Sequence, residues 1–180
     1  MVHLLTNTAE SGSMTTESGS PEPVDYIERT RSQYDALGYP PYTWVHNPES
    51  PPFTPLSKPL ARARVGLICS GGIYARGQIA FHFKDDISYR KIAMRMPRHE
   101  LRVTHFAYDL EDARRDPAVV FPARTLTGLA DAGAIGSVAD YAYTFMGGIY
   151  SSRKVREVLA PRLVAECIRD EVDVVVMVPV

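Results

Sequence analysis

The carboxyl-terminal run of residues 171–180 constrains the fold of this 180-residue chain more than any other feature. Its sequence, Glu-Val-Asp-Val-Val-Val-Met-Val-Pro-Val, is short, apolar and rich in β-branched side chains, and it follows an expected helix. Such a run is typical of a buried parallel strand. Ligands of open α/β sheets bind just beyond the carboxyl ends of the strands, which is the position of Val180. Either this strand is a structural one at the end of the chain, or the chain lacks part of its active site.

Composition and charge exclude several classes of protein. The 180 residues and 20.0 kDa suffice for one domain with a core, and 45% hydrophobic residues indicate a globular protein. A net charge of −1 offers no electrostatic attraction to nucleic acid or to an anionic membrane. The two cysteines form no disulfide framework, and neither a signal peptide nor a membrane-spanning run is apparent. We therefore expect a cytoplasmic protein that binds neither nucleic acid nor membrane.

The amino-terminal third of the chain is expected to lie outside the main domain. Residues 1–23 are rich in Ser, Thr, Gly and Glu and predict a disordered tail. Apolar spacing over residues 24–37, closed by Gly38, predicts a short helix. Residues 39–59 hold seven prolines interleaved with aromatic side chains, which favours an extended arm packed on the body. The expected organisation is a tail (1–23), a helix with a proline-rich arm (24–60) and an α/β domain (61–180).

The remainder of the chain alternates strand and helix patterns. We expect strands at residues 64–69, 101–108 and 172–180, helices at 122–132 and 151–169, and a loop at 81–97. Pro161 lies inside the second of these helices and predicts a kink or a break there. This order favours an α/β fold with a mostly parallel sheet and helices on both faces, Rossmann-like, preceded by the proline-rich arm.

Two identical tetrapeptides stand out as candidates for ligand binding. Gly-Gly-Ile-Tyr occurs at residues 71–74, after the first expected strand, and 76 residues later at 147–150, before the last expected helix. Paired glycines let a backbone approach a ligand or adopt positive φ, and a helix N-terminus attracts anions. The alternative is two tight turns that share residues by chance. Neither copy is a dinucleotide fingerprint or a P-loop. The candidates for substrate binding are Gly71, Gly72, Tyr74, Gly147, Gly148 and Tyr150.

Three further side chains near expected strand ends are candidates for catalysis. Cys69 ends the first strand and is either a nucleophilic thiol or a buried structural cysteine. His105 and Asp109 fall near the end of the second strand, where a histidine beside a carboxylate can act as a general acid or base. A parallel sheet would bring them and the diglycine turns to one edge.

The segment Asp85-Asp86-Ile-Ser-Tyr-Arg90 is a further polar candidate. Asp86 and Arg90 could bind a substrate, or the segment could be a solvated loop. We expect no metal site. The sequence contains no H-E-x-x-H, C-x-x-C or G-x-S-x-G motif, so the readings as zinc protease, zinc finger and hydrolase lack support.

Several segments occur in the order found in one known family. They are residues 64–74 (Arg-Val-Gly-Leu-Ile-Cys-Ser-Gly-Gly-Ile-Tyr), 86–90 (Asp-Ile-Ser-Tyr-Arg), 116–122 (Asp-Pro-Ala-Val-Val-Phe-Pro) and 126–136, which end in Gly-Ala-Ile-Gly. Together they resemble the selenoprotein B family, which comprises the B components of glycine, sarcosine and betaine reductases and the small subunit of D-proline reductase. Ala118 replaces an asparagine that is usual in that family. The resemblance covers about residues 39–180.

The resemblance implies reductive cleavage of a C–N bond at the α-carbon of an amino acid or its derivative. In the family a selenolate or thiolate attacks and thiols supply the electrons. The attacking Sec or Cys lies in a short segment after a strand that resembles residues 172–180. It would therefore follow Val180, and a UGA codon interpreted as a stop would leave the reductase-type domain truncated. No other bound cofactor is expected, since the pyruvoyl group of D-proline reductase sits on a different subunit.

The resemblance also implies partners and residue roles. The family works in multi-subunit complexes, so we expect other reductase subunits and a small amino-acid substrate. His105 would handle a proton, Asp109 would orient it or the substrate ammonium, and the diglycines would admit the substrate backbone. Two alternatives stay open, namely a non-catalytic binding or regulatory subunit with the same fold, and a small thiol oxidoreductase that uses Cys69.

Overall fold

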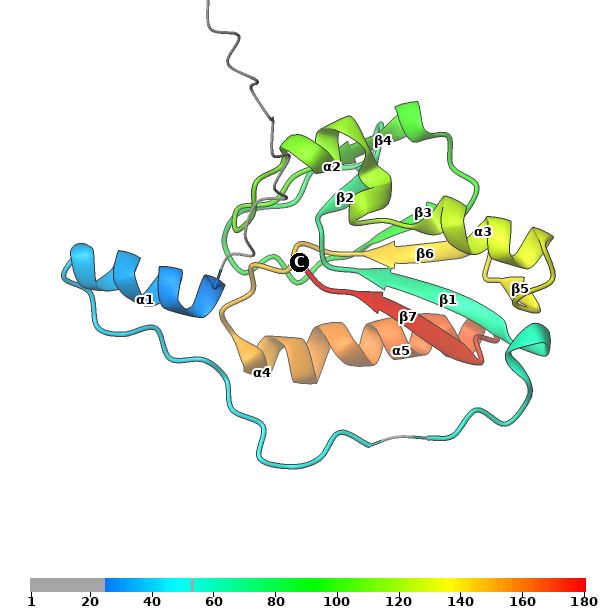
Figure 1. Cartoon of the computed structure of the whole chain (residues 1–180), viewed down its shortest axis with the longest axis horizontal. Coiled ribbons are helices and arrows are strands. Elements are labelled where there is room, and N and C mark those ends of the chain that lie inside the picture. The colour runs from blue at the N-terminus through cyan, green and yellow to red at the C-terminus, as the bar shows by residue number, and fades with distance from the viewer. Residues whose placement is uncertain (1–24, 53) are drawn as a thin grey trace, which may run out of the picture. The chain divides into compact units, whose positions relative to one another are not determined.

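The computed structural model of the chain describes residues 25–52 and 54–180 (Figure 1). The chain divides into two compact units, Met1–Asn47 and Pro48–Val180, and each is described by itself. The tail expected at residues 1–23 lies outside the described residues.

The first unit contains the helix α1 (Tyr26–Ala36), as the apolar spacing predicts. The carboxylate of Asp25 caps it by accepting a hydrogen bond from the backbone N–H of Glu28 at 3.0 Å. Gly38 follows it with a φ of +68°, a conformation that ends helices and favours glycine. Beyond it, the ring of Tyr42 contacts that of Trp44, with centroids 4.7 Å apart. The packing of the proline-rich arm on the body stays a prediction.

The second unit is built around the parallel strand β1 (Arg64–Cys69). On one side β1 pairs in parallel with β5 (Ser137–Val138) and β6 (Tyr141–Thr144), and on the other with β7 (Val174–Val178). The mostly parallel sheet and the parallel carboxyl-terminal strand are thus confirmed. Burial of the last strand was overestimated, because β7 pairs with β1 alone among the described residues, and the side chain of Met177 is 69% exposed.

The loop expected at residues 81–97 is wrong in part, because Arg90–Ala93 form strand β3. It pairs antiparallel with β6, and Ile92 is fully buried opposite Ala142. Ile92, Met94 and Met96 alternate with Lys91, Ala93 and Arg95, but this period of two is short and stops at Pro97, so the local signal is weak. The pairing with β6 therefore decides the conformation, as often happens for short edge strands.

The strand expected at residues 101–108 is shorter than predicted and belongs to a separate antiparallel ribbon. Only β4 (Leu101–Val103) is a strand, and it pairs with β2 (Ile73–Ala75) rather than with the parallel sheet. The turn at Gly72, with a φ of +71°, comes between β1 and β2. The backbone N–H of Thr104 then donates to the carbonyl of Gly72 at 2.9 Å and closes the ribbon.

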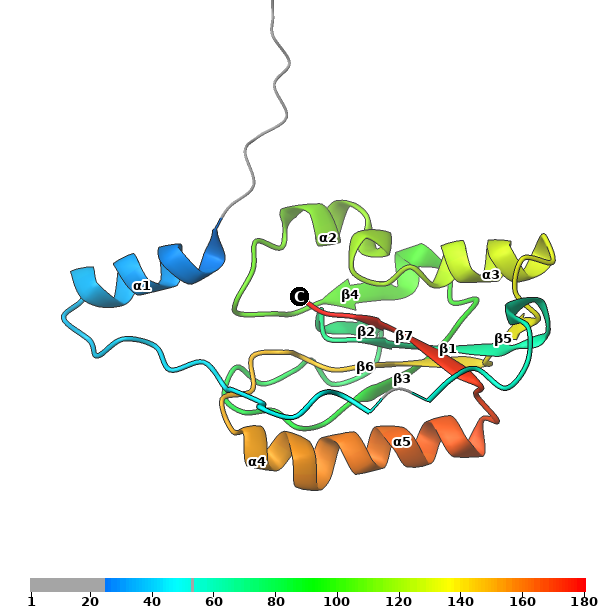
Figure 2. The same ribbon diagram turned by 60° about the horizontal axis from the view of Figure 1, so that its bottom comes forward.

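Helices cover both faces of the sheet, as expected (Figure 2). On one face lie α2 (Glu111–Arg115) and α3 (Ala123–Asp131). On the other lie α4 (Ser152–Lys154), a π-helical segment (Val155–Leu159) and α5 (Ala160–Arg169). Single 3₁₀ turns occupy Leu60–Arg62, Arg98–Glu100 and Pro117–Val119.

The helices predicted at residues 122–132 and 151–169 are confirmed. Pro161, which cannot donate a hydrogen bond to the preceding turn, is preceded by the π-helical segment, so the helix continues instead of ending. Alternation along β1 supplies both cores: Leu67 packs on the α3 face with Leu126, and Ile68 on the α5 face with Leu163. The finer expectation of a Rossmann-like fold stays a prediction.

Candidate functional site at the carboxyl edge of the sheet

The two identical tetrapeptides lie side by side where β1 and β6 end. Gly71 forms an antiparallel bridge with Met146, and the backbone N–H of Gly72 donates to the carbonyl of Phe145 at 2.9 Å. The N–H of Gly147 donates to the carbonyl of Ser70 at 2.8 Å. Parallel pairing of β1 and β6 therefore brings residues 70–72 and 145–147, which are far apart in the sequence, into one site. We call this site the carboxyl edge.

The protein's own atoms pack closely against the diglycines. A Cβ atom on Gly72 would lie 1.9 Å from the backbone oxygen of Thr104, and its φ of +71° also favours glycine. At Gly147 a Cβ atom would lie 3.1 Å from Cβ of Ser70 and 3.3 Å from the carbonyl oxygen of Val180. Neighbouring protein atoms thus account for both glycines, and admission of a substrate backbone stays a prediction.

His105 lies against both turns and is buried, with 4% of its surface exposed. Its Nδ1 accepts a hydrogen bond from the backbone N–H of Ala107 at 3.1 Å. Its Nε2 accepts a hydrogen bond from the backbone N–H of Gly147 at 3.2 Å. Burial lowers the pKa of His105, while its bond to Ser70 acts in the opposite direction. Backbone groups of three segments therefore hold this imidazole between the two turns.

Two residues of the carboxyl edge were missed by the sequence reasoning. The ring of Tyr108 lies 4.7 Å from that of His105, and its hydroxyl donates to the carbonyl of Gly71 at 2.9 Å. The hydroxyl of Ser70 accepts a hydrogen bond from the backbone N–H of Val180 at 2.8 Å. The position of Ser70 directly after a strand and before a diglycine was the available signal.

The end of β7 therefore belongs to this site. The N–H of Ser70 donates to the carbonyl of Val178 at 3.0 Å, which continues the β1–β7 ladder past the end of β1. Beside it opens a hollow of about 330 Å³ with mostly apolar walls. Its lining residues are Ile68, Ser70, Phe145, Met177, Val178 and Pro179.

The predicted partnership of His105 and Asp109 does not form. Asp109 is exposed, and its carboxylate accepts a hydrogen bond from the backbone N–H of Glu111 at 2.9 Å, at the start of α2. The imidazole of His105 instead bonds to backbone groups. The expectation assumed that a parallel strand carries both residues to one edge of the sheet. Strand β4 instead belongs to the antiparallel ribbon and ends at Val103, before either residue.

Cys69 is a protonated thiol in the core. Its side chain is fully buried, and burial raises its pKa to about 12. Burial also raises the pKa of Cys167, the other free cysteine of the described chain, and the nearby Asp170 adds to this effect. Neither environment favours a thiolate at neutral pH.

Asp86 and Arg90 organise their own loop. The carboxylate of Asp86 accepts hydrogen bonds from the backbone N–H groups of His82 and Ser88, both at 2.8 Å. The guanidinium of Arg90 donates to the Ser88 hydroxyl at 2.8 Å and lies over the ring of Phe81, 4.3 Å from its centroid. These contacts give both residues a structural role, and substrate binding by them stays a prediction.

The two tyrosines of the tetrapeptides have different surroundings. Tyr74 lies in β2 opposite Arg102, with its ring 6.4 Å from that of Phe81. Tyr150 is 71% exposed, and its backbone N–H donates to the carboxylate of Asp85 at 2.8 Å. The structure thus places Tyr74 in the antiparallel ribbon and Tyr150 at the start of the last helix.

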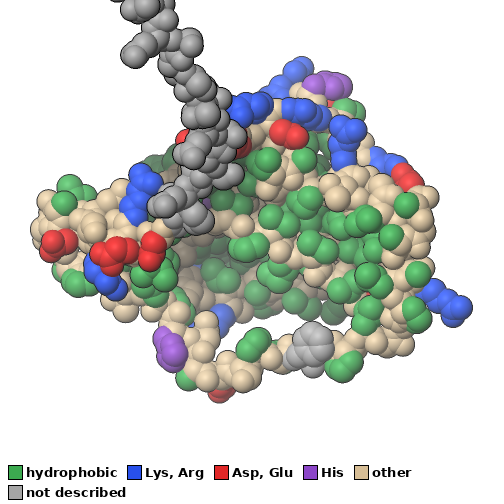
Figure 3. Space-filling model, viewed as in Figure 1, with side chains coloured by type: hydrophobic (Ala, Val, Ile, Leu, Met, Phe, Trp, Pro, Cys, Tyr) green, Lys and Arg blue, Asp and Glu red, His purple; other side chains and the backbone are tan. Residues whose placement is uncertain are grey.

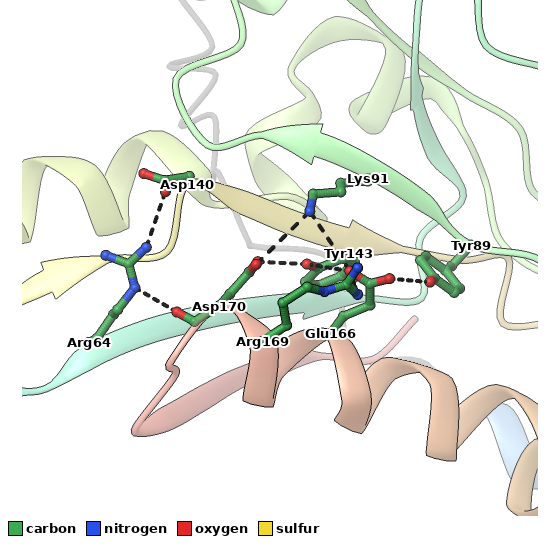
Figure 4. Close-up of polar contacts among 8 residues, drawn as sticks. All are labelled: Arg64, Tyr89, Lys91, Asp140, Tyr143, Glu166, Arg169 and Asp170. Carbon is green, nitrogen blue, oxygen red and sulfur yellow. Dashed lines mark hydrogen bonds and ion pairs between the residues drawn. The ribbon is translucent and has the colours of Figure 1, made fainter.

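A second polar cluster joins α5 to β3 and β6 (Figure 4). The hydroxyl of Tyr143 lies between two carboxylates, 2.9 Å from Glu166 Oε2 and 2.6 Å from Asp170 Oδ2. The hydroxyl of Tyr89 donates to Glu166 Oε1 at 2.6 Å. The Nζ of Lys91 lies 3.8 Å from Glu166 and 4.0 Å from Asp170. The sequence reasoning missed this cluster because its members come from three separate segments.

Electrostatics identify this cluster as structural. Hydrogen bonds from Tyr89, and then from Arg169 and Tyr143, hold the pKa of Glu166 at about 2, although desolvation acts to raise it. Burial and the two carboxylates raise the pKa of Tyr143. Two carboxylates thus face two cations, Lys91 and Arg169, so the cluster has no net charge. Its groups bond to one another, and these bonds hold α5 against β3 and β6.

Among residues 25–52 and 54–180, no group of three or more His, Cys, Asp and Glu side chains is arranged to hold a metal ion. In the same residues, no helix combines the length and the apolar character needed to cross a lipid bilayer.

Comparison with known proteins places the chain among reductase components. Residues 44–180 match the family described as "Glycine/sarcosine/betaine reductase selenoprotein B (GRDB)". The chain is 28% identical over 135 residues to the D-proline reductase subunit gamma of Acetoanaerobium sticklandii. That alignment covers 74% of this chain and 56% of the relative, so the chain spans little more than half the relative's length. No solved structure is significantly similar to the chain.

Proposed function

Since this chain belongs to the glycine/sarcosine/betaine reductase selenoprotein B family, we propose that it is a subunit of a reductase complex that cleaves a C–N bond. The substrate class is an amino acid or its N-methylated or cyclic derivative, and a dithiol supplies the electrons. The observation that carries the proposal is the carboxyl edge, where the end of β7, the Ser70 hydroxyl and the buried His105 meet. The residues that form it lie within the matched region.

The chemistry proposed for this edge balances as a two-electron reduction. A selenolate or thiolate attacks the α-carbon, a carbon–chalcogen bond forms, and the amine leaves with the C–N electron pair and takes a proton. A thiolate then attacks the chalcogen, and the carbon leaves with the bonding pair and takes a proton. The second thiol of the donor resolves the mixed bond into a disulfide and restores the chalcogenolate. The dithiol is thereby oxidised, and the substrate is reduced by cleavage of its C–N bond; an acyclic substrate releases its amine, whereas a cyclic one opens its ring and keeps it.

We propose that the chalcogen reaches the carboxyl edge at the position after Val180, where the family resemblance expects Sec or Cys. Both cysteines of the described chain have raised pKa values and are poor nucleophiles at neutral pH. The backbone of Val180 is held by Ser70, so a residue joined to it would emerge beside Gly147 and the apolar hollow. His105 and Tyr108 hold the surrounding turns in place.

Extension of the chain tests the proposal. The gene is expressed as the 180-residue chain and, in parallel, with a cysteine codon after Val180 followed by its own downstream sequence. Each product is combined with partner subunits from a related reductase complex. The assay measures dithiol-dependent release of amine from glycine, sarcosine and betaine, and ring opening of D-proline. We expect activity when the partner subunits are combined with the extended chain, and none when they are combined with the 180-residue chain. Equal activity of both chains would contradict the placement of the chalcogen and return attention to Cys69.

A non-catalytic binding or regulatory subunit with the same fold is the second candidate. It is favoured by the hydrogen bonding of the carboxyl edge, where His105 is engaged by backbone groups on both ring nitrogens. This candidate predicts that the 180-residue chain increases the activity of the other subunits without supplying a redox group of its own.

A further inference from the structure

Arginine side chains gather on the face of the second unit that α2 and α3 cover. Six arginines lie between residues 95 and 124, and the same stretch contains no lysine. Figure 3 shows Lys and Arg side chains along the upper margin of the view, the margin that carries α2 and β4 in Figure 1. A guanidinium is planar and binds carboxylates through paired hydrogen bonds, whereas a lysine ammonium is a point charge. This face is therefore suited to carboxylate ligands.

Three of these arginines line a hollow between α3 and the residues that follow β3. The hollow measures about 270 Å³, and its lining includes Arg95, Arg98 and Arg124 but no carboxylate. Arg95 pairs with Asp131, the last residue of α3, at 2.7 Å. Within the described part of the chain, no hydrogen bond or ion pair engages the side chain of Arg124, which is exposed in the first turn of α3. Its positive charge is thus uncompensated.

A second hollow offers two further guanidiniums. It measures about 230 Å³ and is lined by Arg102 and Arg114, again without a carboxylate. The Nη1 atom of Arg102 donates to the carbonyls of His99 and Leu101, at 2.8 and 2.7 Å, which fixes this guanidinium in place. Arg114 is exposed in α2, and among the described residues its side chain has no hydrogen-bonding or ionic partner.

The two hollows are neighbours. Arg98 lines the first hollow, and its Nε lies 3.7 Å from the carboxylate of Asp116. The next residue, Pro117, lines the second hollow. A ligand that extends past this ion pair would reach both hollows, which we together call the arginine surface.

The acidic side chains close to the arginine surface are largely engaged by other arginines. Arg115 binds Glu111 and Asp112 within α2, at 2.7 and 2.9 Å. The Nε of Arg76 lies 3.6 Å from Glu100. Three of the five guanidiniums of the arginine surface therefore have no carboxylate partner among residues 54–180, namely those of Arg102, Arg114 and Arg124.

We propose that the arginine surface binds an acidic segment of another subunit, with carboxylates of that segment on Arg124 and Arg114. Guanidiniums on both sides of an ion pair call for at least two carboxylates on one ligand. A polypeptide segment supplies them, whereas a single small anion fills only one hollow. The choice of a subunit as the partner rests on the proposed place of this chain in a reductase complex. Complementary charge also favours rapid and specific association of such partners.

The arginine surface lies away from the point at which further residues of this chain would begin. Residues after Val180 would start beside β7, and β1 and β6 separate β7 from β3 in the sheet. Strand β3 leads directly into the first hollow, which begins at Met94. A separate polypeptide is therefore the proposed occupant, and the experiment includes a chain extended beyond Val180.

Fluorescence anisotropy of a labelled hexaglutamate peptide tests the proposal. The 180-residue chain and the chain extended past Val180 should both bind the peptide. Binding should weaken about tenfold as salt rises from roughly 0.05 M to roughly 0.5 M, because salt screens exposed charges. Arg124→Gln and Arg114→Gln should each raise the Kd about threefold, and the double substitution about tenfold. Arg156→Gln is the matched control, since Arg156 is exposed on the face that α5 covers, and its Kd should be unchanged.

Each contrary result overturns the proposal in a recognisable way. Absence of binding, or an equal loss in Arg156→Gln, would show that no specific surface for carboxylates exists. Displacement of the peptide by inorganic phosphate at an equal concentration would show a site for a small anion. Binding by the 180-residue chain alone would show that residues after Val180 fill the hollows. The readout requires no catalysis, so its failure is distinguishable from failure of the reductase assay.

Discussion

The backbone N–H of Val180 donates a hydrogen bond to the hydroxyl of Ser70, 110 residues earlier in the chain, with a nitrogen–oxygen distance of 2.8 Å. Ser70 follows β1 and Val180 follows β7, so this bond joins the ends of two neighbouring parallel strands. The carbonyl of Ser70 in turn accepts from Gly147 and faces His105. A single serine therefore organises the three segments that form the carboxyl edge.

Substitution of Ser70 by alanine removes the acceptor for Val180. We expect the free energy of unfolding to fall by about 1 kcal/mol, the usual net contribution of one hydrogen bond. Exchange of the Val180 amide should accelerate, whereas exchange in the middle of β1 should not. Urea unfolding and amide exchange measured by NMR check both expectations. Ser152→Ala is the control, because the Ser151 hydroxyl caps that helix; unchanged Val180 exchange in Ser70→Ala would contradict the assignment.

Gly72→Ala should destabilise the protein far more than Gly77→Ala. Both glycines have positive φ, +71° and +86°, so both substitutions strain the backbone. At Gly72 the new Cβ atom would also meet the Thr104 carbonyl at 1.9 Å, whereas at Gly77 nothing lies within 4 Å. We expect losses of about 3–5 kcal/mol and about 1 kcal/mol, respectively. Thermal unfolding of both variants measures the difference, and similar losses would show that close packing is not the cause.

The polar cluster that joins α5 to β3 and β6 should make the free energy of unfolding depend on pH in the acidic range. The pKa of Glu166 is lowered from 4.5 to about 2 in the folded protein, chiefly by the hydrogen bond from Tyr89. Because the folded pKa lies below the unfolded one, this carboxylate stabilises the fold above about pH 4.5. That contribution is lost as the pH falls toward 2.

Comparison of the wild type with Glu166→Gln isolates this effect. The difference between their urea midpoints should be largest at neutral pH and should shrink as the pH falls from 4.5 toward 2. Glu157→Gln is a matched control, since Glu157 pairs with Arg153 at an exposed site on the same helical run. A difference independent of pH would show that Glu166 acts through packing rather than charge.

Both cysteines should resist thiol reagents in the native protein. Burial raises the pKa of Cys69 to about 12, so its thiolate is scarce at neutral pH. Labelling of the Cys167→Ser variant should therefore be slow until denaturant is added, and it reports Cys69 alone. The expected measurement is release of the reagent's chromophore in native and unfolded protein. Rapid native labelling would favour a thiol oxidoreductase that uses Cys69.

The sequence by itself determined the elements with strong local signals. The β-branched run at residues 172–180 and the apolar run at 64–69 predicted two strands, and both form as neighbours in a parallel sheet. Helices at residues 122–132 and 151–169 were predicted from caps, prolines and apolar stripes, which act within a few residues. Motif order, a one-dimensional property, sufficed to indicate the family that the comparison found.

Only the tertiary structure decided what meets at the carboxyl edge. Strand β3 forms because Ile92 is buried against β6, and the ribbon of β2 and β4 forms because Gly72 admits Thr104 at close range. The sequence could suggest that His105 and Asp109 act together, but their directions depend on where β4 turns away. Ser70 and Tyr108 became visible only in three dimensions, since each hydrogen-bonds to a residue far along the chain. Local patterns specify elements, whereas a site depends on contacts between residues that no local period links.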